Sequence, residues 1–293
     1  MRKIQMGRVL SRYVLTAAVA LSACGTPQVE PARDASSLQQ ADIEKVRRLL
    51  PLARDGDEGA KQKILEMRAA AVPGLLDSME GGLRIPALRI AGELAELNEG
   101  TEQLEKAAPL LITLLQDDEW EVAQAASFTL ESVANKNPGS KALAKAVPVL
   151  VNNLSHEKAE VAKAAAWALR VVGDESAVQP LVKLLADDNM KQSASEALVA
   201  IGIPAVPGLV ACLSDSALSR KCARLLGEIG SPVIPEVLNS LTHDEAMVRE
   251  RSAWILGMIA DPAVLPRLRE VAEQDPDESV RSAANIAILA IPQ

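Results

Sequence analysis

Aromatic residues are nearly absent from this sequence: one Phe, one Tyr and three Trp make up 2% of its 293 residues. Hydrophobic residues nevertheless account for 48% of the chain, so a core must be filled mainly by Leu, Ile, Val and Ala. Enzymes with one compact centre usually need bulkier side chains, whereas thin layers of stacked helices do not. The scarcity of rings therefore favours stacked helices.

Basic residues are also in short supply, since 31 Lys and Arg stand against 39 Asp and Glu and the net charge is −8. A surface that follows the phosphates of DNA or RNA needs an excess of positive charge. We therefore expect no nucleic-acid partner. The high apolar content, with 24% charged residues, indicates a folded chain rather than a disordered one.

Motifs that carry chemistry are lacking as well. The sequence contains no glycine-rich phosphate loop, Ser–His–Asp set, paired-Cys motif or metal-ligand cluster. His156 and His243 fall in equivalent turns of distant segments, which favours capping or solvated roles. Asp55–Gly59, with Glu66 further on, has acids at the first, third and twelfth positions of a calcium loop, but it lacks the oxygen ligand at the fifth and the Gly at the sixth, so we interpret it as a helix cap. We expect no catalytic residue, metal, cofactor or small-molecule substrate.

The first 23 residues have the pattern of an export signal. Tyr13–Ala20 is apolar and uncharged, but too short to span a bilayer, which needs about 20 apolar residues. The segment before it contains four basic side chains, namely Arg2, Lys3, Arg8 and Arg12. Leu21–Cys24 then resembles the lipobox of bacterial lipoproteins, which implies cleavage before Cys24 and acylation of that residue. The alternative is an incidental Cys in an ordinary signal.

The lipoprotein resemblance also predicts a location in the cell envelope. Gly25, and not Asp, follows Cys24, which resembles the default sorting signal for the outer membrane, facing the periplasm. Sorting rules differ among bacteria, so the sequence does not decide which membrane holds the anchor. Residues 24–41 are polar and lack periodicity, and we interpret them as the lipidated Cys and a flexible tether. Cleavage removes four basic residues and no acidic one, which takes the net charge to −12.

Residues 42–293 consist of similar copies, the sign of a repeat architecture. Seven plain copies follow a degenerate one, and each opens with an apolar residue before Pro, in one case with a slip of one residue. The openings lie 27 to 39 residues apart, at Val72-Pro73, Ala108-Pro109, Val147-Pro148, Gln179-Pro180, Val206-Pro207, Ile234-Pro235 and Leu265-Pro266.

Each copy is predicted to form two helices. Pro suits the first turn of the first helix, where its missing N–H has no partner to lose. A polar turn follows, and the second helix ends at a small residue such as Gly202 or Gly230. One hairpin cannot bury its own apolar stripe, but stacked neighbours can. The sequence therefore predicts an all-α solenoid of about seven to eight stacked antiparallel hairpins.

These copies resemble HEAT repeats, in particular the short HEAT-like repeats of bacterial scaffold proteins and phycobilin lyases. Val248-Arg249, Val280-Arg281 and Leu226–Gly230 carry the resemblance. The spacing is shorter than the ~40–47 residues of large HEAT repeats. Ala123 and Ala162 stand where the family has Arg, so we expect its Asp–Arg ladder between repeats to be incomplete.

Cys212 and Cys222 lie in one predicted hairpin, near the end of its first helix and the start of its second. An exported protein meets an oxidising compartment, so a disulfide is one interpretation. Cys222 also belongs to a column of small residues, where a buried free thiol fits equally. Both interpretations stay open.

One side of the second helices is predicted to face away from the core. Numbering each second helix from the residue equivalent to Val248, the apolar stripe takes positions one, five, eight and nine, which leaves positions three and seven outside. In HEAT-like solenoids this side lines the concave surface. Position seven holds Arg89, Phe128, Trp167, Glu196, Arg224, Trp254 and Ile286. Position three holds Gln124, Lys163, Gln192, Arg220, Glu250 and Ser282.

Three of the five aromatic residues share position seven, and exposed rings beside Arg are typical of binding hot spots. The alternative is that the rings fill gaps over Ala-rich surfaces. We hypothesise a membrane-tethered, non-catalytic scaffold that binds a protein or peptide through Phe128, Trp167, Arg220, Arg224, Trp254 and Ile286. A lyase-type enzyme similar to HEAT-like bilin lyases would need a pigment pocket and a cytoplasmic address, which the export signal contradicts. A passive envelope protein is the third hypothesis.

Overall fold

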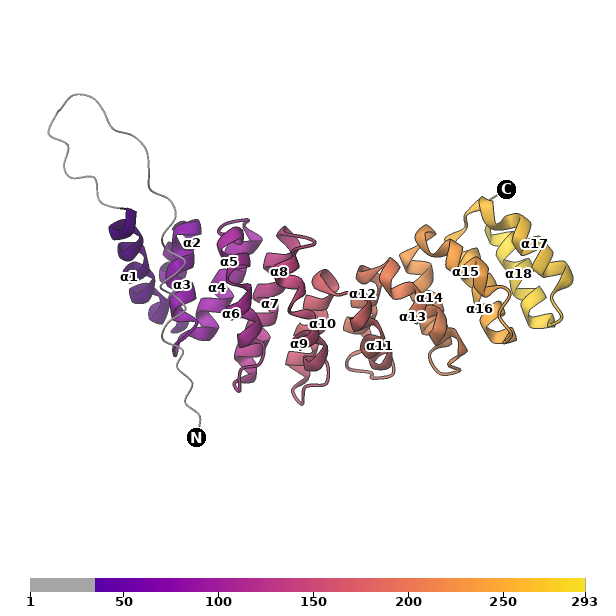
Figure 1. The fold of residues 1–293 in the computed structure, drawn as a ribbon, viewed down its shortest axis with the longest axis horizontal. Helices are drawn as coiled ribbons and strands as arrows, with labels where there is room; N and C mark the ends of the chain where they lie inside the picture. The colour runs from indigo at the N-terminus through magenta and orange to yellow at the C-terminus, as the bar shows by residue number, and fades with distance from the viewer. Residues whose placement is uncertain (1–34, 293) are drawn as a thin grey trace, which may run out of the picture. The chain divides into compact units, whose positions relative to one another are not determined.

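The computed structural model describes residues 35–292, and every regular element in that range is a helix (Figure 1). This confirms the predicted all-α fold of helical hairpins. The chain divides into residues 1–38, of which only the last four are described, and residues 39–293. The predicted signal peptide, Cys24 and residues 25–34 lie outside the described residues.

Seven hairpins match the seven plain copies. Their helices, in chain order, are α3 (Val72–Ser78) with α4 (Arg84–Glu96), α6 (Ala108–Leu114) with α7 (Trp120–Lys136), α9 (Val147–Asn153) with α10 (Ala159–Val172), α11 (Glu175–Leu184) with α12 (Lys191–Ile201), α13 (Val206–Ala211) with α14 (Ser219–Ile229), α15 (Ile234–Ser240) with α16 (Ala246–Ile259), and α17 (Leu265–Gln274) with α18 (Glu278–Ala290). Consecutive pairs lie side by side in chain order (Figure 1).

The degenerate copy is formed by α1 (Ala35–Arg54) and α2 (Glu58–Glu66). Residues 35–41, at the end of the segment interpreted as the tether, form the start of α1. Val46 and Leu50 of α1 are fully buried, and a helix nucleated there extends at little cost through the Ala, Ser, Leu and Gln residues before it.

The core lies between a layer of first helices and a layer of second helices. Each first helix contributes a large apolar side chain that is fully buried. In six of the seven helices this residue lies two positions after the opening Pro, and in α11 it lies one position after Pro180. These are Leu75, Leu111, Leu150, Leu209, Val237 and Leu268, with Leu181 in α11. Position five of the second helices carries small buried side chains, which lets the two layers approach closely: Ala87, Ala126, Ala165, Ala194, Cys222, Ser252 and Ala284.

Hydrogen bonds also join neighbouring repeats. The Thr129 hydroxyl of α7 donates to the Leu88 carbonyl of α4 over 2.8 Å. Buried Asn153, at the end of α9, donates through Nδ2 to the Leu115 carbonyl of the preceding repeat over 2.9 Å. Leu115 lies at the carboxyl end of α6, where carbonyls lack an intrahelical partner, and both bonds tie one hairpin to the next.

The structure differs from the predicted hairpin in its connections. Pro180 is the sixth residue of α11 and not part of its first turn, because Asp174 caps the helix earlier by accepting from the Ser176 N–H over 2.9 Å. Short helices α5 (Thr101–Lys106) and α8 (Lys141–Ala144) precede two first helices. Short 3₁₀ turns, among them η4 (Cys212–Ser214), replace parts of other connections.

Among residues 35–292, no single helix has both the length and the apolarity to cross a bilayer. The bent pair Lys191–Ile201 and Ile203–Ser214, at 115°, meets these criteria only when its two parts are taken together.

Candidate functional site: the outer side of the second helices

The side chains at positions three and seven of α4, α7, α10, α12, α14, α16 and α18 define a surface that we call the second-helix face. Five of the seven residues at position seven are exposed, and Phe128 and Trp167 are half-buried. The residues on either side of each, at positions five, eight and nine, are largely buried. The helical period thus places the predicted column at the surface, and only its two central rings are partly covered.

Phe128 and Trp167 form a ring pair across two repeats. Phe128 lies on α7 and Trp167 on α10, and their ring centroids are 5.3 Å apart with an angle of 35° between the planes. This distance is within the range of favourable aromatic contacts. Each interpretation from the sequence holds in part, because the rings pack on each other and are still partly accessible to solvent.

A second apolar group lies on α16 and α18. Trp254 is 39% exposed, Met258 42%, Ile286 61% and Leu289 86%, and we call these four residues the C-terminal apolar patch. Met258 is four residues after Trp254, and Leu289 three after Ile286, so each pair shares one side of its helix. Sequence reasoning missed Met258 and Leu289, although their spacing from the ring column was the available signal.

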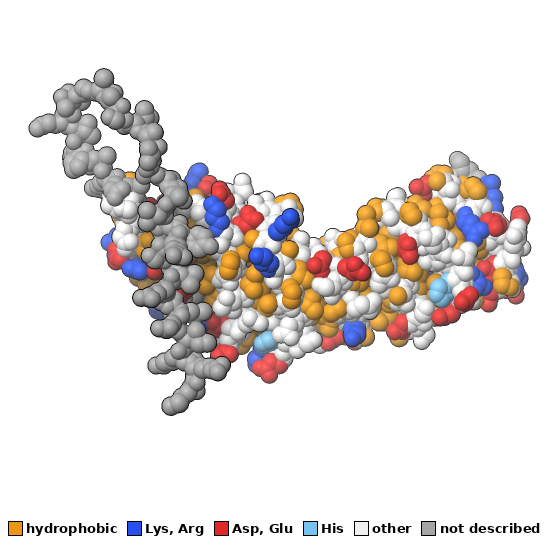
Figure 2. Space-filling view, viewed as in Figure 1, with side chains coloured by type: hydrophobic (Ala, Val, Ile, Leu, Met, Phe, Trp, Pro, Cys, Tyr) orange, Lys and Arg blue, Asp and Glu red, His pale blue; other side chains and the backbone are white. Residues whose placement is uncertain are grey.

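Two Arg residues occupy α14, one of the two second helices between these apolar groups. Arg220 and Arg224 lie four apart on α14, and both are exposed. Arg224 contacts Glu228 over 3.3 Å, whereas Arg220 makes no ion pair with any residue in 35–292. In the space-filling view, hydrophobic side chains extend along the visible surface, with acidic and basic groups interspersed among them (Figure 2).

A disulfide fixes the helix that carries these two Arg residues. Cys212, in η4, and Cys222, in α14, are joined with an S–S distance of 2.09 Å and Cα atoms 6.2 Å apart. Of the two interpretations left open by the sequence, the structure contains the disulfide. Both residues are buried, with Cys222 fully so, and the bond ties the start of α14 to the end of the preceding helix.

A cavity of about 380 Å³ adjoins the face at its N-terminal end, lined by residues of α1, α2 and α4 that include Arg89. Its other cations are paired: Lys61 lies 2.8 Å from Glu93, and Arg84 lies 2.6 Å from Asp117. The hydrogen bond with Glu93 raises the pKa of Lys61. Arg54 also pairs with Asp55, so three of the four cations that line the cavity are already paired, and the cavity defines no particular ligand.

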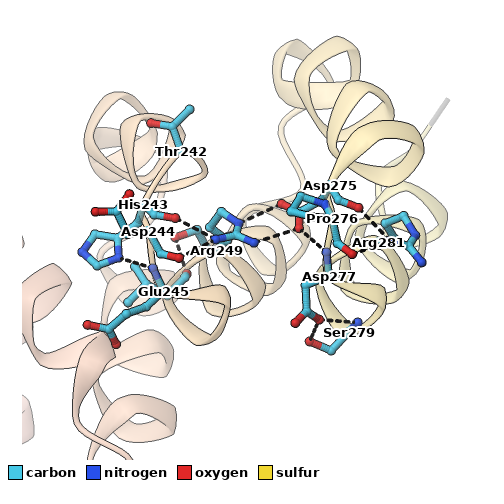
Figure 3. Close-up of polar contacts among 12 residues, drawn as sticks. Thr242, His243, Asp244, Glu245, Arg249, Asp275, Pro276, Asp277, Ser279 and Arg281 are labelled. Carbon is cyan, nitrogen blue, oxygen red and sulfur yellow. Dashed lines mark hydrogen bonds and ion pairs between the residues drawn. The ribbon is translucent and has the colours of Figure 1, made fainter.

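Away from the face, one junction between repeats is built by Arg249. Its guanidinium donates to both carboxylate oxygens of Asp275, over 2.8 and 2.9 Å, and to the carbonyls of His243 and Asp244 (Figure 3). The hydrogen bond from Arg249 holds the pKa of Asp275 below its usual value and raises that of Arg249. Arg281 donates to the Asp275 carbonyl over 2.7 Å.

The predicted Asp–Arg ladder is incomplete within residues 35–292. Arg84 of α4 holds the same position as Arg249 and binds Asp117 of the next repeat, a match that the sequence comparison missed. Ala123 and Ala162 hold that position in the two following second helices and cannot form such a bond. The junction after Ala123 keeps the Asn153 hydrogen bond to the Leu115 carbonyl and a 2.6 Å ion pair between Arg170 and Glu131. The Thr129 bond lies instead at the junction that Arg84 already joins.

The remaining candidates have structural roles. Nδ1 of His156 accepts from the Lys158 N–H over 3.0 Å, and Nδ1 of His243 accepts from the Glu245 N–H over 3.1 Å. Asp57 caps α2 by accepting from the Ala60 N–H over 3.0 Å. In the part of the chain that the structure describes, no group of three His, Cys, Asp or Glu residues could hold a metal ion.

This architecture, helical hairpins stacked so that each covers the apolar side of its neighbour, defines the class of α-solenoid repeat proteins. The family of HEAT repeats matches residues 107–202 and 206–289, more than half of the sequence. The chain belongs to the HEAT-repeat family. No curated protein sequence matches it.

Solved structures show the same kind of likeness at low identity. An engineered protein is 21% identical, with 75% of this chain and 95% of the other covered and a TM-score of 0.41. Human deoxyhypusine hydroxylase in complex with glycerol is 20% identical, with 87% and 97% covered and a TM-score of 0.35. The complex of CpcE and CpcF of phycocyanin lyase from Nostoc sp. PCC7120 is 20% identical, with 75% and 94% covered and a TM-score of 0.40. Likenesses at this level say nothing about activity.

Proposed function

We propose that this protein is a membrane-tethered, non-catalytic scaffold that binds a protein or peptide partner through the second-helix face. The observation that carries the proposal is that Phe128, Trp167, Trp254 and Ile286 hold one position of four second helices and all reach the surface. Large apolar side chains at the surface, with Arg beside them, have the composition of binding hot spots. HEAT repeats commonly serve as protein-interaction modules.

The membrane tether rests on the sequence before the first helix. The basic segment, the short apolar run and Leu21–Cys24 support export and acylation of Cys24, with the mature protein held at the outer membrane and facing the periplasm. Ten residues, 25–34, separate Cys24 from the start of α1. At most about 3.5 Å per residue, they allow a distance of up to about 35 Å between the anchor and α1.

The non-catalytic part of the proposal rests on the side chains themselves. His156 and His243, the residues best suited to general acid–base chemistry near neutral pH, lie in different repeats and use Nδ1 to order their own turns. Nucleophilic catalysis needs a base within hydrogen-bonding reach of the nucleophile. The two Cys residues of the described chain are joined to each other and supply no thiolate.

Replacement of the rings on the second-helix face tests the scaffold. Partners crosslinked to the membrane-anchored protein are isolated, and their affinity is measured for Trp167→Ala and Trp254→Ala. We expect each variant to lose about 2 kcal/mol, roughly 30-fold in affinity, while its circular dichroism spectrum is unchanged. Trp120→Ala is the matched control, because Trp120 begins α7 and lies outside the second-helix face. Unchanged partners and affinities in both variants would favour a passive envelope protein.

Mass spectrometry of the mature amino end tests the anchor separately. We expect the chain to begin at an acylated Cys24. A mature chain that retains Met1, or carries an unmodified Cys24, would remove the anchor from the proposal and leave the scaffold to be judged by the ring variants.

A further inference from the structure

The second-helix face has a charge opposite to that of the whole chain. Its two columns hold four basic side chains, Arg89, Lys163, Arg220 and Arg224, and two acidic ones, Glu196 and Glu250. The full sequence has a net charge of −8. Positive charge is thus concentrated on the surface that also carries the exposed rings, in a protein that is acidic elsewhere.

The two acidic side chains of the face already have partners. Glu250 contacts Arg251, which lies outside the columns, over 3.0 Å, and Glu196 accepts from the Gln192 amide over 2.6 Å. Among residues 35–292, no ion pair involves Arg89, Lys163 or Arg220. The contact of Arg224 with Glu228 is solvent-exposed and of the kind that contributes little. The face therefore offers several cations to an external acidic group.

Cations lie beside and between the two apolar groups of the face, while α12 contributes Glu196, which accepts from Gln192. Lys163 lies one turn before Trp167 on α10, so a charge adjoins the Phe128–Trp167 ring pair. Arg220 and Arg224 follow on α14, and Trp254 and Met258 come next on α16. Neighbouring helices pack about 8–10 Å apart, so the three steps from α10 through α12 and α14 to α16 separate the two apolar groups by about 25–30 Å. An extended chain at about 3.3 Å per residue covers this distance in roughly eight or nine residues.

We propose that the partner of this face is an extended acidic polypeptide segment with a large apolar side chain near each end, an inference that rests on the proposed function. One apolar side chain packs on Phe128 and Trp167, and the other packs on the C-terminal apolar patch. Asp or Glu side chains between them bind Arg220 and Arg224. A narrow segment fits half-buried rings better than the flat surface of a bilayer does.

Three synthetic peptides of fifteen residues serve as probes for the full chain. The first carries Leu-Phe near each end and Asp and Glu between, the second replaces the acids by Lys, and the third keeps the acids but replaces the apolar ends by Ser. Affinity is measured by calorimetry at low and high salt. We expect the first peptide to bind at least tenfold more tightly than either of the others, and its affinity to fall with added salt.

Charge reversal identifies the residues. Arg220→Glu combined with Arg224→Glu is expected to weaken the first peptide at least tenfold and to remove most of the salt dependence. Lys141→Glu combined with Lys183→Glu is the matched control, because it makes the same change in net charge at exposed positions of α8 and α11, away from the face. We expect this control to change the affinity less than threefold.

Several outcomes would overturn the inference. If the Lys peptide binds as well as the acidic one, and Trp167→Ala and Trp254→Ala abolish both, the acidic partner is wrong while the scaffold function stands. If the acidic peptide binds the Arg and the Trp variants as tightly as it binds the wild type, the face is not its site. If no peptide binds at millimolar concentration, or if the chain binds anionic phosphatidylglycerol vesicles in preference to every peptide, the inference is wrong.

Discussion

Arg249 of α16 donates two hydrogen bonds, of 2.8 and 2.9 Å, to the carboxylate of Asp275 in the next repeat. Asp275 caps the carboxyl end of α17. Their side chains are only 11% and 6% exposed, so this two-point ion pair is shielded from solvent. Charge-assisted pairs of this geometry are stronger than neutral hydrogen bonds. Arg249 also binds two carbonyls of the turn before α16, so one side chain connects both turns of the terminal repeats.

Loss of Arg249 should therefore destabilise the C-terminal hairpins. Arg249→Ala leaves the Asp275 carboxylate with little solvent and no cation, and we expect a loss of about 3 kcal/mol in the free energy of unfolding. Urea unfolding followed by circular dichroism measures it. Arg47→Ala is the control, since Arg47 pairs with Asp77 in an exposed two-point contact, and its urea midpoint should hardly move. Equal effects of the two substitutions would show that burial of the pair is unimportant.

The same pair predicts a dependence on pH. The Arg249 hydrogen bond lowers the pKa of Asp275 from 3.8 in the folded protein, so folding is favoured by the ionised carboxylate. This contribution is complete above the unfolded value near 3.8 and is lost as the pH falls through the lower folded value. We expect the difference in urea midpoint between wild type and Arg249→Ala to be constant from pH 5 to 7 and to shrink below about pH 4. A difference that stays constant down to pH 2 would contradict the assignment.

The helical period was enough to predict much of this fold. The spacing of Pro, Leu and small residues predicted seven hairpins, and it placed Phe128, Trp167 and Trp254 on one side of the second helices. Period alone could not predict how exposed a border position is, because that depends on the neighbouring helix. Met258 lies over Gly227 of α14 yet remains 42% exposed, and Leu289 is 86% exposed at the position that Gly257 holds in α16.

Connections were predicted less well than helices. A Pro after an apolar residue was taken to mark the first turn of each first helix, and in α11 the Asp174 cap overrode that signal. The pairing of Cys212 with Cys222 was also beyond the sequence, because position five accepts a small buried thiol as readily as half of a disulfide. Both outcomes depend on local geometry and not on the repeat period.

Two equivalent glycines should respond to substitution in opposite ways. At Gly257 of α16, an added Cβ would lie 2.8 Å from Cβ and 2.9 Å from Cα of Ala287, so Gly257→Ala must push α18 away. At Gly92 of α4, the nearest atom would be Cα of Thr129 at 3.6 Å, an ordinary contact. We expect Gly257→Ala to lower the free energy of unfolding by about 1–3 kcal/mol and Gly92→Ala to raise it by up to about 1 kcal/mol. Chemical denaturation tests both, and stabilisation by Gly257→Ala would show that the helices are farther apart than described.

Substitutions at Asp57 can distinguish a helix cap from a calcium site. The carboxylate accepts from the Ala60 N–H over 3.0 Å, and Asp57→Ala should cost about 1 kcal/mol in stability. Asp57→Ser can accept the same bond and should restore most of the loss. We expect millimolar calcium to leave the melting temperature of all three proteins unchanged. A rise with calcium that Asp57→Ala abolishes would restore the calcium interpretation.

Reduction of the disulfide should lower stability without dismantling the repeats. Cys212 and Cys222 are ten residues apart, and closing a loop of this size restricts the unfolded chain enough to contribute about 2–3 kcal/mol. The helices around the bond retain buried Leu209, Leu225 and Leu226 in its absence. We therefore expect reductant to lower the urea midpoint of the wild type to that of Cys212→Ala combined with Cys222→Ala, and to leave the double variant unaffected. Alkylation of the denatured, unreduced protein provides the direct check, because labelling of Cys212 or Cys222 under those conditions would show that the thiols are free.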